Sequence, residues 1–429
     1  MTGAEASTLV ERDRRCVWHP FTQRGMGGEP LPVVSALGST LRLEDGREVL
    51  DGISSWWCNT LGHGHPELLK AAREQMERLD HVMFASFTHE PAVALAEELI
   101  EAAPPGYGKV FFSDNGSTAC EVAIKMAVQL FSNRGARHRT WVVALEDSYH
   151  GDTFGAMAAG ERGVFSAPFD EMLFRVERVP AQGGAAGQER MREICSRGDV
   201  AAFIFEPLVQ GAGGMKMHSV QALDGYLSIA REFGVVTIAD EVMTGFGRLG
   251  PLFASSLLKH GPEILCLSKG LTGGTMPLAV TLVRDALFDE FVSPDHSRTF
   301  FHGHTYTAHP VACAVARRAL ALTAQSSCAE ERARIEQRHR AFAQELQREG
   351  ELSDVRVCGT ILAFNRKSRS GSGYLSSAAK GVTQFFLERG VLLRPLGDVL
   401  YVLPPYCTSD GELEKIYGTI REFVRATTR

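Results

Sequence analysis

The sequence predicts an α/β protein built around a mostly parallel sheet. Residues 235–239 and 264–267 are short runs rich in branched or bulky apolar residues, and each ends abruptly at a polar residue, Asp240 and Ser268 respectively. Strands that are buried on both faces of a parallel sheet have this pattern. The segment between the two runs is long enough for a crossover connection. Helical periodicity elsewhere, as in the apolar stripe of residues 119–130, supplies the helices that such a sheet requires.

Length and composition are those of a globular protein with one large domain or two to three modest ones. The chain has 429 residues, of which 44% are hydrophobic and 22% are charged. A net charge of −6 argues against a nucleic-acid partner or an acidic membrane surface. No apolar run approaches the ~20 residues that span a bilayer. The first residues are polar and of mixed charge, unlike a secretory signal, so we expect a cytoplasmic protein.

The cysteines and histidines show no metal-binding or disulfide pattern. Nine cysteines are scattered along the chain without a C-x-x-C pair, and fourteen histidines show no H-E-x-x-H spacing. An odd number of dispersed cysteines fits a reducing compartment. We therefore expect neither a disulfide framework nor a bound metal.

Two charged residues are expected at the same edge of the sheet. Asp240 follows the first apolar run and Lys269 lies just beyond the second, each before a glycine-rich turn. Open α/β sheets bind ligands at the carboxyl ends of their strands. A buried acid facing a buried lysine suits pyridoxal phosphate (PLP): the lysine forms a Schiff base, and the acid keeps the pyridine nitrogen protonated. Taken singly, the aspartate is more often a helix cap and the lysine a solvated side chain.

The segments ADEVMTGFGR and LSKGLTGG resemble the signature of the class III, or ω-type, aminotransferases of PLP fold type I. The resemblance covers essentially the whole chain. It implies a large PLP-binding domain over residues 56–325 with a mostly parallel, seven-stranded sheet. Residues 1–55 and 326–429 would form a small α/β domain from both chain ends. The implied reaction is transamination, in which Lys269 moves the proton and Asp240 holds the pyridine nitrogen.

A second set of residues is expected to hold the PLP phosphate. Gly116, Ser117 and Thr118 lie between an apolar strand and a helix, where free N–H groups meet the positive helix end. Taken alone this is an ordinary capped helix, and Thr118 has capping-box spacing to Glu121. The resemblance assigns Gly116, Ser117 and Thr118 to the phosphate grip.

Further cofactor contacts are implied by the family resemblance alone. Tyr149, in the Y-H-G-D-T segment, would lie against the cofactor ring, and Val242 would pack on its opposite face. In the family, the threonine of a G-x-T segment reaches into the neighbouring subunit and binds its PLP phosphate. Here that segment is Gly303, His304 and Thr305, with histidine where some members have proline. A homodimer with shared active sites is implied.

Several motifs are typical of the biotin-pathway members of this family, which aminate 8-amino-7-oxononanoate with S-adenosylmethionine as donor. They are W-H-P-F-T, S-S-W-W, H-V-M-F-A-S-F-T-H, E-P-L-V-Q-G-A-G-G-M and F-F-H-G-H-T-Y. The substrate-binding residues implied are Phe21, Trp56, Trp57, Tyr149, Lys269, Gly303 and Arg394.

Arg394 and the two tryptophans have distinct expected roles. The guanidinium of Arg394 would take the substrate carboxylate in a bidentate contact. Adjacent side chains on an extended chain point in opposite directions, so at most one of Trp56 and Trp57 need be core. We expect the pair to line an apolar slot for the alkyl chain of the substrate.

Two other functions remain open. An ω-amino acid:pyruvate aminotransferase would share every PLP residue, and a non-catalytic PLP-fold protein is disfavoured because Asp240 and Lys269 are both present. Glutamate-using relatives often carry Q-G-E-A-G where this chain has Gly211-Ala212-Gly213, so the acid that neutralises their pocket arginine is missing here. Phe21 stands where many users of S-adenosylmethionine have tyrosine. The donor could therefore be another amine, such as lysine.

Overall fold

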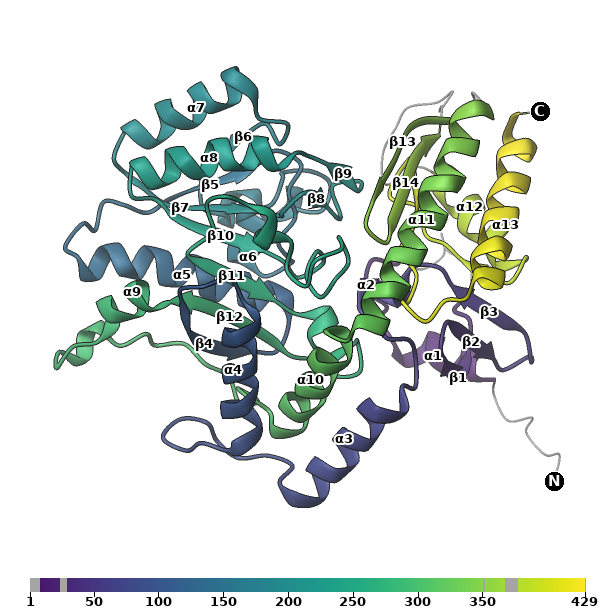
Figure 1. The fold of residues 1–429 in the computed structure, drawn as a ribbon, viewed down its shortest axis with the longest axis horizontal. Helices are drawn as coiled ribbons and strands as arrows, with labels where there is room; N and C mark the ends of the chain where they lie inside the picture. Colours follow the sequence, from purple (N-terminus) through teal and green to yellow (C-terminus); the bar gives the residue numbers. More distant parts are fainter. Residues whose placement is uncertain (1–7, 24–28, 350–351, 367–376, 429) are drawn as a thin grey trace.

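The computed structural model describes residues 8–23, 29–349, 352–366 and 377–428. Its centre is a seven-stranded sheet with the strand order β4-β12-β11-β10-β7-β5-β6 (Figure 1). Only β12 runs antiparallel to its neighbours within this sheet, which confirms the predicted mostly parallel α/β fold. The strands are β4 (Tyr107–Ser113), β5 (Trp141–Leu145), β6 (Val176–Val179), β7 (Val200–Phe205), β10 (Val236–Asp240), β11 (Ile264–Leu267) and β12 (Ala279–Arg284).

Both faces of this sheet are buried at its centre, which explains why its central strands are mostly apolar. On β5, Val142 and Ala144 face the core beneath α5 (Gly116–Asn133), whereas Val143 and Leu145 face the opposite core. The alternation follows from the two-residue repeat of a strand. The run predicted at residues 235–239 is β10, displaced by one residue, and the run at residues 264–267 is β11.

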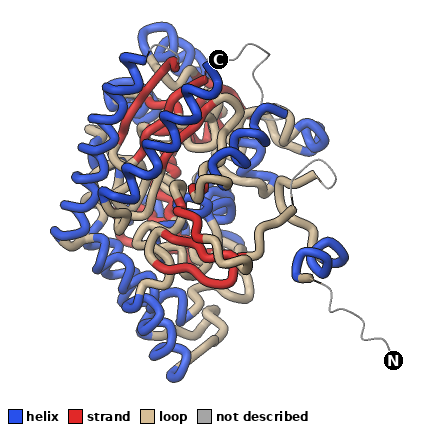
Figure 2. The backbone as a smooth tube through the Cα atoms, turned by 90° about the vertical axis from the view of Figure 1, so that its right-hand side faces the viewer, coloured by secondary structure: helices blue, strands red, loops and turns tan. Residues whose placement is uncertain are grey.

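Helices lie on the outside and strands run through the interior (Figure 2). None of the helices in the described part of the chain is both long and apolar enough to cross a bilayer. Besides α5, the helices are α1 (Leu9–Cys16), α2 (Ser54–Trp57), α3 (Pro66–Arg78), α4 (Glu90–Ala102), α6 (Phe154–Ala159), α7 (Gly184–Ser196), α8 (Val220–Glu232), α9 (Asp285–Phe288), α10 (Pro310–Thr323), α11 (Ser326–Glu349), α12 (Ser377–Leu387) and α13 (Asp410–Thr428).

The two ends of the chain meet in smaller sheets beside the large one (Figure 1). Near the N-terminus, an antiparallel meander consists of β1 (Val33–Leu37), β2 (Thr40–Leu43) and β3 (Glu48–Asp51). The C-terminal strand β15 (Val391–Leu392) pairs in parallel with β3. The remaining strands are β13 (Leu352–Cys358), β14 (Ile361–Arg366) and β16 (Val399–Val402), which form one sheet, and β8 (Val209–Gln210) and β9 (Lys216–Met217), which form another. The boundaries at residues 55/56 and 325/326 stay a prediction.

A histidine is locked in the core between α11, α13 and β14. The side chain of His339 is fully buried, with Nδ1 2.6 Å from the Tyr417 hydroxyl and Nε2 3.1 Å from the Thr360 carbonyl oxygen. A neutral ring satisfies both contacts, because Nε2 donates to the carbonyl and Nδ1 accepts from the hydroxyl. Burial lowers the pKa of His339 to about 3, despite the opposing bond to Thr360.

We therefore expect acid to destabilise the fold through His339. Its pKa is about 6.5 when exposed and about 3 when folded, so below pH 6.5 the unfolded chain binds more protons than the folded one. This contribution to stability is present above pH 6.5 and is lost by about 1.4 kcal/mol for each pH unit below it. The free energy of unfolding, measured with urea between pH 7 and 5.5, should fall less steeply with decreasing pH for His339→Gln than for the wild type. Parallel curves would contradict the assignment.

Candidate active site

A cavity of about 900 Å³ opens at the carboxyl edge of the large sheet. Strand ends, the start of α5, the turn at α2 and the segment after β15 all contribute to its wall. Ten of the predicted site residues line it, namely Phe21, Trp56, Trp57, Gly116, Ser117, Tyr149, Asp240, Val242, Lys269 and Arg394. Thr118, Gly303, His304 and Thr305 are not among the lining residues. The cavity therefore brings together most of the positions that the sequence singled out.

Strand register places Asp240 and Lys269 in the same wall. Asp240 ends β10 and is paired with Cys266 of β11, which ends one residue later, just before Ser268 and Lys269. The backbone of Lys269 is left-handed, with φ of 44°, a strain of about 1–3 kcal/mol for a non-glycine residue. Burial lowers the pKa of the Lys269 amine, although Asp240 opposes the shift. A depressed amine pKa favours the neutral, nucleophilic form.

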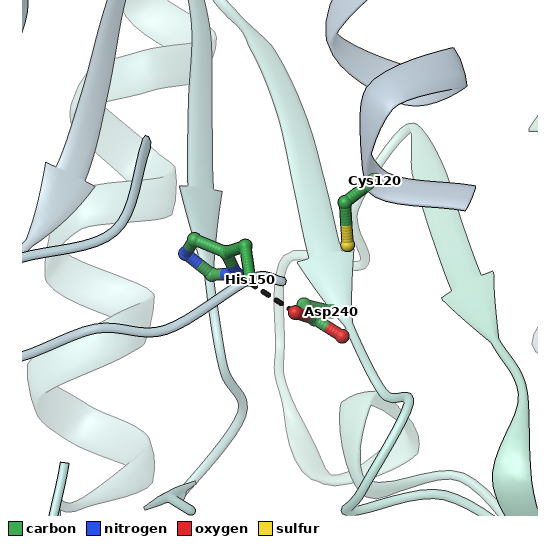
Figure 3. A group of neighbouring side chains, drawn as sticks. All are labelled: Cys120, His150 and Asp240. Atoms are coloured by element: carbon green, nitrogen blue, oxygen red, sulfur yellow. Dashed lines mark hydrogen bonds and ion pairs between the residues drawn. The ribbon is translucent and has the colours of Figure 1, made fainter. Parts of the chain in front are cut away.

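Asp240 is held by a buried histidine (Figure 3). Nδ1 of His150 lies 2.7 Å from Oδ2 of Asp240, and the backbone N–H of Val242 donates to Oδ1 at 3.1 Å. Burial alone would lower the pKa of His150, but hydrogen bonds to Asp240 and Cys120 outweigh it and raise the pKa to about 10. His150 is thus a cation at neutral pH, paired with the carboxylate.

Cys120, His150 and Asp240 also have the donor types of a metal site. One candidate ligand atom from each lies within 4.8 Å of the others, and all three residues are buried. The hydrogen bond between His150 and Asp240 already uses one atom of each side chain (Figure 3). The charges of this pair offset each other without an ion, so we interpret the cluster as support for the floor of the cavity.

Tyr149 is fixed by Glu206, which follows β7. Oε1 of Glu206 accepts from the backbone N–H of Tyr149 at 3.1 Å, and Oε2 accepts from Gly211 at 2.8 Å. Burial raises the pKa of Glu206 to about 7, although the charge of His150 opposes it. Burial and the neighbouring Asp152 raise the pKa of Tyr149, so its phenol keeps its proton and can donate a hydrogen bond.

The start of α5 corrects the predicted capping box. Asn115 is the N-cap, and its side chain accepts from the backbone N–H of Thr118 at 3.0 Å. The Thr118 hydroxyl donates to the Asn115 carbonyl at 2.8 Å. The predicted partner, Glu121, instead accepts from the backbone N–H of Ala156 at 2.9 Å. The pairing of Thr118 with Glu121 was wrong because Asn115 caps the helix one turn earlier.

Two glycines make a tight cradle at the start of α5, where this helix packs against the segments after β5 and β10. A Cβ on Gly116 would lie 2.5 Å from Cγ1 of Val242, and one on Gly151 would lie 2.0 Å from Oγ of Ser117. Gly151 also has φ of 128°, which favours glycine. Free N–H groups at the start of an 18-residue helix attract an anion. Together with Asp240 and Lys269, this cradle fits PLP.

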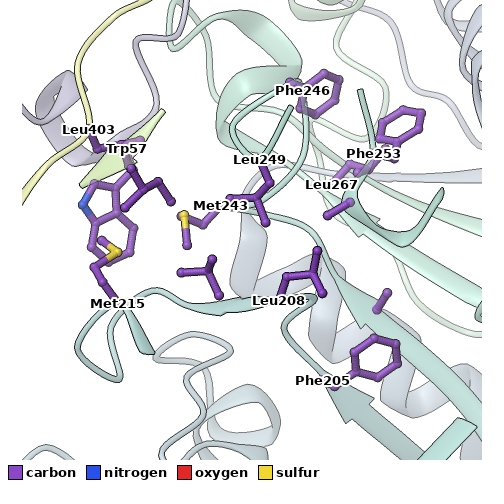
Figure 4. Close-up of a cluster of buried hydrophobic side chains, with 14 of the residues drawn as sticks. Trp57, Phe205, Leu208, Met215, Met243, Phe246, Leu249, Phe253, Leu267 and Leu403 are labelled. Carbon is purple, nitrogen blue, oxygen red and sulfur yellow. The ribbon is translucent and has the colours of Figure 1, made fainter. Parts of the chain in front are cut away.

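The two tryptophans differ in burial, although both line the cavity. Trp57 is only 6% exposed, lies beside Met215 and Met243 (Figure 4), and donates from Nε1 to the Tyr401 hydroxyl at 2.8 Å. Its ring centroid is 5.1 Å from Nζ of Lys269. Trp56 is 46% exposed, and the guanidinium carbon of Arg394 lies 4.8 Å from its ring centroid. Both rings line the cavity.

The predicted G-x-T segment lies away from the cavity of its own chain. Gly303 and Thr305 are exposed, and His304 is half-buried. The backbone N–H of His304 donates to the Thr307 hydroxyl at 3.1 Å, which closes a tight turn. The assigned roles of these residues, and that of Thr118, stay predictions.

Sequence reasoning missed several residues that shape the site. His150 could have been found, because it directly follows Tyr149 in the same motif. Phe165 and Tyr401 gave no signal, because they come from segments without a motif and reach the cavity only through the fold. The ring centroid of Phe165 is 6.0 Å from that of Phe21, which lies 5.6 Å from Trp56. These three rings form an aromatic cluster at the cavity.

Comparison with known proteins agrees with this geometry. The family model described as Aminotransferase class-III matches residues 22–424. This chain belongs to the class III aminotransferases. The family implies PLP as the cofactor, and the predicted enzyme class is confirmed.

This class III aminotransferase has relatives of nearly equal length. The adenosylmethionine-8-amino-7-oxononanoate aminotransferase of Synechococcus elongatus is 44% identical over 95% of this chain and 98% of the relative. The protein of that name from Corynebacterium glutamicum is 36% identical over 98% of this chain and 99% of the relative.

Solved structures of the family superpose closely on the aminotransferase. The crystal structure of adenosylmethionine-8-amino-7-oxononanoate aminotransferase from Methanocaldococcus jannaschii has a TM-score of 0.90 at 30% identity, and the match covers 96% of this chain and 98% of the other. An omega transaminase from Pseudomonas jessenii in complex with PMP has a TM-score of 0.90 at 28% identity, covering 98% of each chain.

The glycine cradle of the aminotransferase should be intolerant of a side chain. In Gly151→Ala the new methyl group would collide with Ser117 at the start of α5, so we expect PLP retention to fall about tenfold or more, as for a contact worth 1.4 kcal/mol. Equilibrium dialysis of the purified protein would measure it. Gly411→Ala is a matched control, because a Cβ there meets nothing within 4 Å. Equal retention in both variants would contradict the cradle.

Proposed function

We propose that this aminotransferase transfers an amino group from S-adenosylmethionine to 8-amino-7-oxononanoate, forming 7,8-diaminononanoate in biotin biosynthesis. The observation that carries the proposal is the cation–aromatic pair of Arg394 and Trp56 in the same cavity as Lys269. A long acceptor with a carboxylate at one end and a reacting carbonyl at the other needs both groups in one pocket. The names of the relatives from Synechococcus elongatus and Corynebacterium glutamicum support it.

The cavity residues fit PLP, which supplies an electron sink for the carbanion of the substrate. Lys269 would hold its reactive carbon, and the carboxylate of Asp240, kept in place by His150, would hold its ring nitrogen. Tyr149 and Val242 line the cavity and would flank the ring. Gly116 and Ser117 would receive the phosphate, and we retain Thr118 as a member of that segment.

Lys269 is the group that moves the proton. When its amine is free, Nζ takes the proton from the Cα atom of the donor and later returns one to the product, as a general base and acid. Burial lowers the pKa of this amine, which keeps a neutral fraction available to accept the proton. The phenol of Tyr149 stays protonated and orients the reacting amine.

Substrate recognition would divide between charge and apolar surface. The guanidinium of Arg394 takes the carboxylate of the acceptor, a charge-assisted bond worth about 1.5–3 kcal/mol. Trp56 and Trp57 hold the intervening methylene groups, each of which contributes ~0.8 kcal/mol when buried. Phe21, which lies against Trp56, extends the same apolar wall.

The active site is proposed to be complete only in a homodimer. Gly303, His304 and Thr305 lie outside the cavity of their own chain, and Gly303 and Thr305 are exposed. In a dimer this segment would reach the partner's cavity, where Thr305 would add a hydroxyl to the phosphate contacts and Gly303 would approach the substrate. We further propose that the enzyme acts in the cytoplasm.

An ω-amino acid:pyruvate aminotransferase is the second candidate. Phe21 lacks the hydroxyl that many users of S-adenosylmethionine have at this position, and omega transaminases share the fold. The same biotin step with another amino donor, such as lysine, is a variant of the first proposal. Product identification with 8-amino-7-oxononanoate and a panel of donors separates the three.

The acceptor test is sharpened by variants of Arg394. Wild-type enzyme should prefer 8-amino-7-oxononanoate to pyruvate, and Arg394→Ala should raise its KM for the long acceptor about 10- to 100-fold, the equivalent of one charge-assisted bond. Arg394→Lys should recover only part of the loss, because an ammonium cannot bind a carboxylate as a planar fork. Arg389→Ala, which removes an arginine paired with Glu422 outside the cavity, is the control.

The acceptor comparison also has a clear negative outcome. If pyruvate is the better acceptor, or if Arg394→Ala leaves the KM for 8-amino-7-oxononanoate unchanged, the biotin-pathway function is wrong. The ω-amino acid function then replaces it.

Sharing of active sites can be tested by mixing two inactive chains. Lys269→Ala should fold yet lose nearly all turnover, and Thr305→Val should lose PLP retention. In a heterodimer one site carries both defects and the other carries neither. Random exchange should therefore restore activity toward about a quarter of the wild-type rate, because half the dimers are mixed and each has one intact site. Demonstrated subunit exchange without recovery would mean that Thr305 serves its own chain.

A further inference from the structure

The turn that carries both cavity tryptophans has an unusual backbone. Ser54, Ser55 and Trp57 have φ of 51°, 57° and 65°, so three of four successive residues occupy the left-handed region without being glycine. Ser55, with ψ of −99°, is also outside the helical range. Strained residues of this kind persist only where the surroundings enforce them, and they cluster at functional sites.

The carboxylate of Asp51 enforces this turn from within. Its Oδ1 accepts from the backbone N–H groups of Ile53 at 3.3 Å and Ser55 at 2.8 Å. Its Oδ2 accepts from the Ser55 hydroxyl at 3.0 Å and faces Nε2 of His63 at 2.8 Å. Asp51 is only 1% exposed. A buried carboxylate with four partners is an expensive group to retain unless it fixes a conformation.

Asp51 also lies next to the strand that leads to Arg394. It is the last residue of β3 and is paired with Leu392 of β15, two residues before Arg394. Gly52, between Asp51 and the tryptophan turn, packs closely against the same C-terminal segment, since a Cβ there would lie 2.7 Å from Cδ2 of Leu393. Arg394 in turn lies over Trp56. Asp51 thus joins the tryptophan turn to the strand that presents the cavity arginine.

We propose that Asp51, supported by His63, is a positioning residue that sets the selectivity of the cavity for long-chain carboxylate acceptors. It acts through the orientation of Trp56 and Trp57 and touches neither substrate nor cofactor. The inference rests on the proposed function for the choice of the long acceptor.

The chemistry requires a carboxylate at this position. Four donors converge on two oxygens, which only an acceptor-only group can satisfy. In Asp51→Asn one oxygen becomes an NH₂ group, so the Ser55 hydroxyl and His63 lose the acceptor they now share at Oδ2. The backbone of Ser55 is then held by Oδ1 alone, and the turn can relax toward ordinary φ values.

The first measurement needs neither substrate nor cofactor. In a Trp18→Phe, Trp141→Phe background only Trp56 and Trp57 of the four tryptophans remain, so acrylamide quenching of the apoenzyme reports on this turn. Asp51→Asn should make the protected component, Trp57, accessible to quenching. Unchanged quenching would overturn the proposal.

The second measurement compares acceptors. Asp51→Asn should raise the KM for 8-amino-7-oxononanoate about tenfold relative to that for pyruvate, the change expected for loss of one hydrogen bond to a charged group. The kcat with pyruvate should stay near that of wild type. An equal change for both acceptors would reduce Asp51 to a structural residue and overturn the inference.

A matched control and a rescue separate positioning from general stability. Tyr417→Phe removes another buried hydrogen bond, to His339, and should lower stability while leaving quenching and acceptor preference unchanged. Ser55→Gly, placed in Asp51→Asn, should restore Trp57 protection better than Ser55→Ala, because glycine accepts the left-handed backbone.

If Asp51→Asn does not fold, Ser55→Ala alone replaces it in both measurements, because this variant removes one hydrogen bond to Oδ2 of Asp51. Failure of the wild type to aminate 8-amino-7-oxononanoate would overturn the proposed function, whereas the quenching comparison would still decide the role of Asp51.

Discussion

The hydrogen bond between Asp240 and His150 is the interaction on which the site depends. Both side chains are buried, and leaving either without its partner would place an uncompensated charge in the interior, at a cost of about 3–5 kcal/mol. The pair joins the end of β10 to the segment after β5, two strands separated by β7. The pair also fixes the positions of Tyr149, which precedes His150, and of Val242, whose N–H donates to Asp240. The position of Lys269 is set by the pairing of β11 with β10.

The sequence predicts the position of a site residue when that residue belongs to a local pattern. The ends of β10 and β11 predicted where Asp240 and Lys269 lie. Burial on both faces makes such strands mostly apolar, so the polar residues that follow them mark their ends. The cap of α5 was misassigned because Asn115 and Thr118 both have suitable side chains, and only the backbone path selects between them. Phe165 could not be predicted, since its place at the cavity depends on contacts with Phe21, far away in the sequence.

The aromatic cluster of Phe21, Trp56 and Phe165 suits an enzyme that must bind two dissimilar molecules by turns. Its rings come from three separate segments, and apolar faces contact an alkyl chain and a planar heterocycle equally well. Under the proposed function, discrimination between the two substrates would rest on the polar groups of the cavity, above all on Arg394. Phe21 has no hydroxyl to add to these groups, so under the proposed function the donor would be the less constrained of the two substrates.

The union of the two chain ends has a consequence for synthesis on the ribosome. The Ser54 hydroxyl donates to the carbonyl of Leu403, 349 positions later, and β3 pairs with β15, whose residues come 341 positions later. At about 5–20 residues per second, the turn bearing both tryptophans exists for roughly 20 to 70 seconds before its partners emerge. During that interval β3 presents an open edge to other nascent chains. Chaperone capture early in translation would therefore matter more for this protein than for one whose N-terminal segment folds by itself.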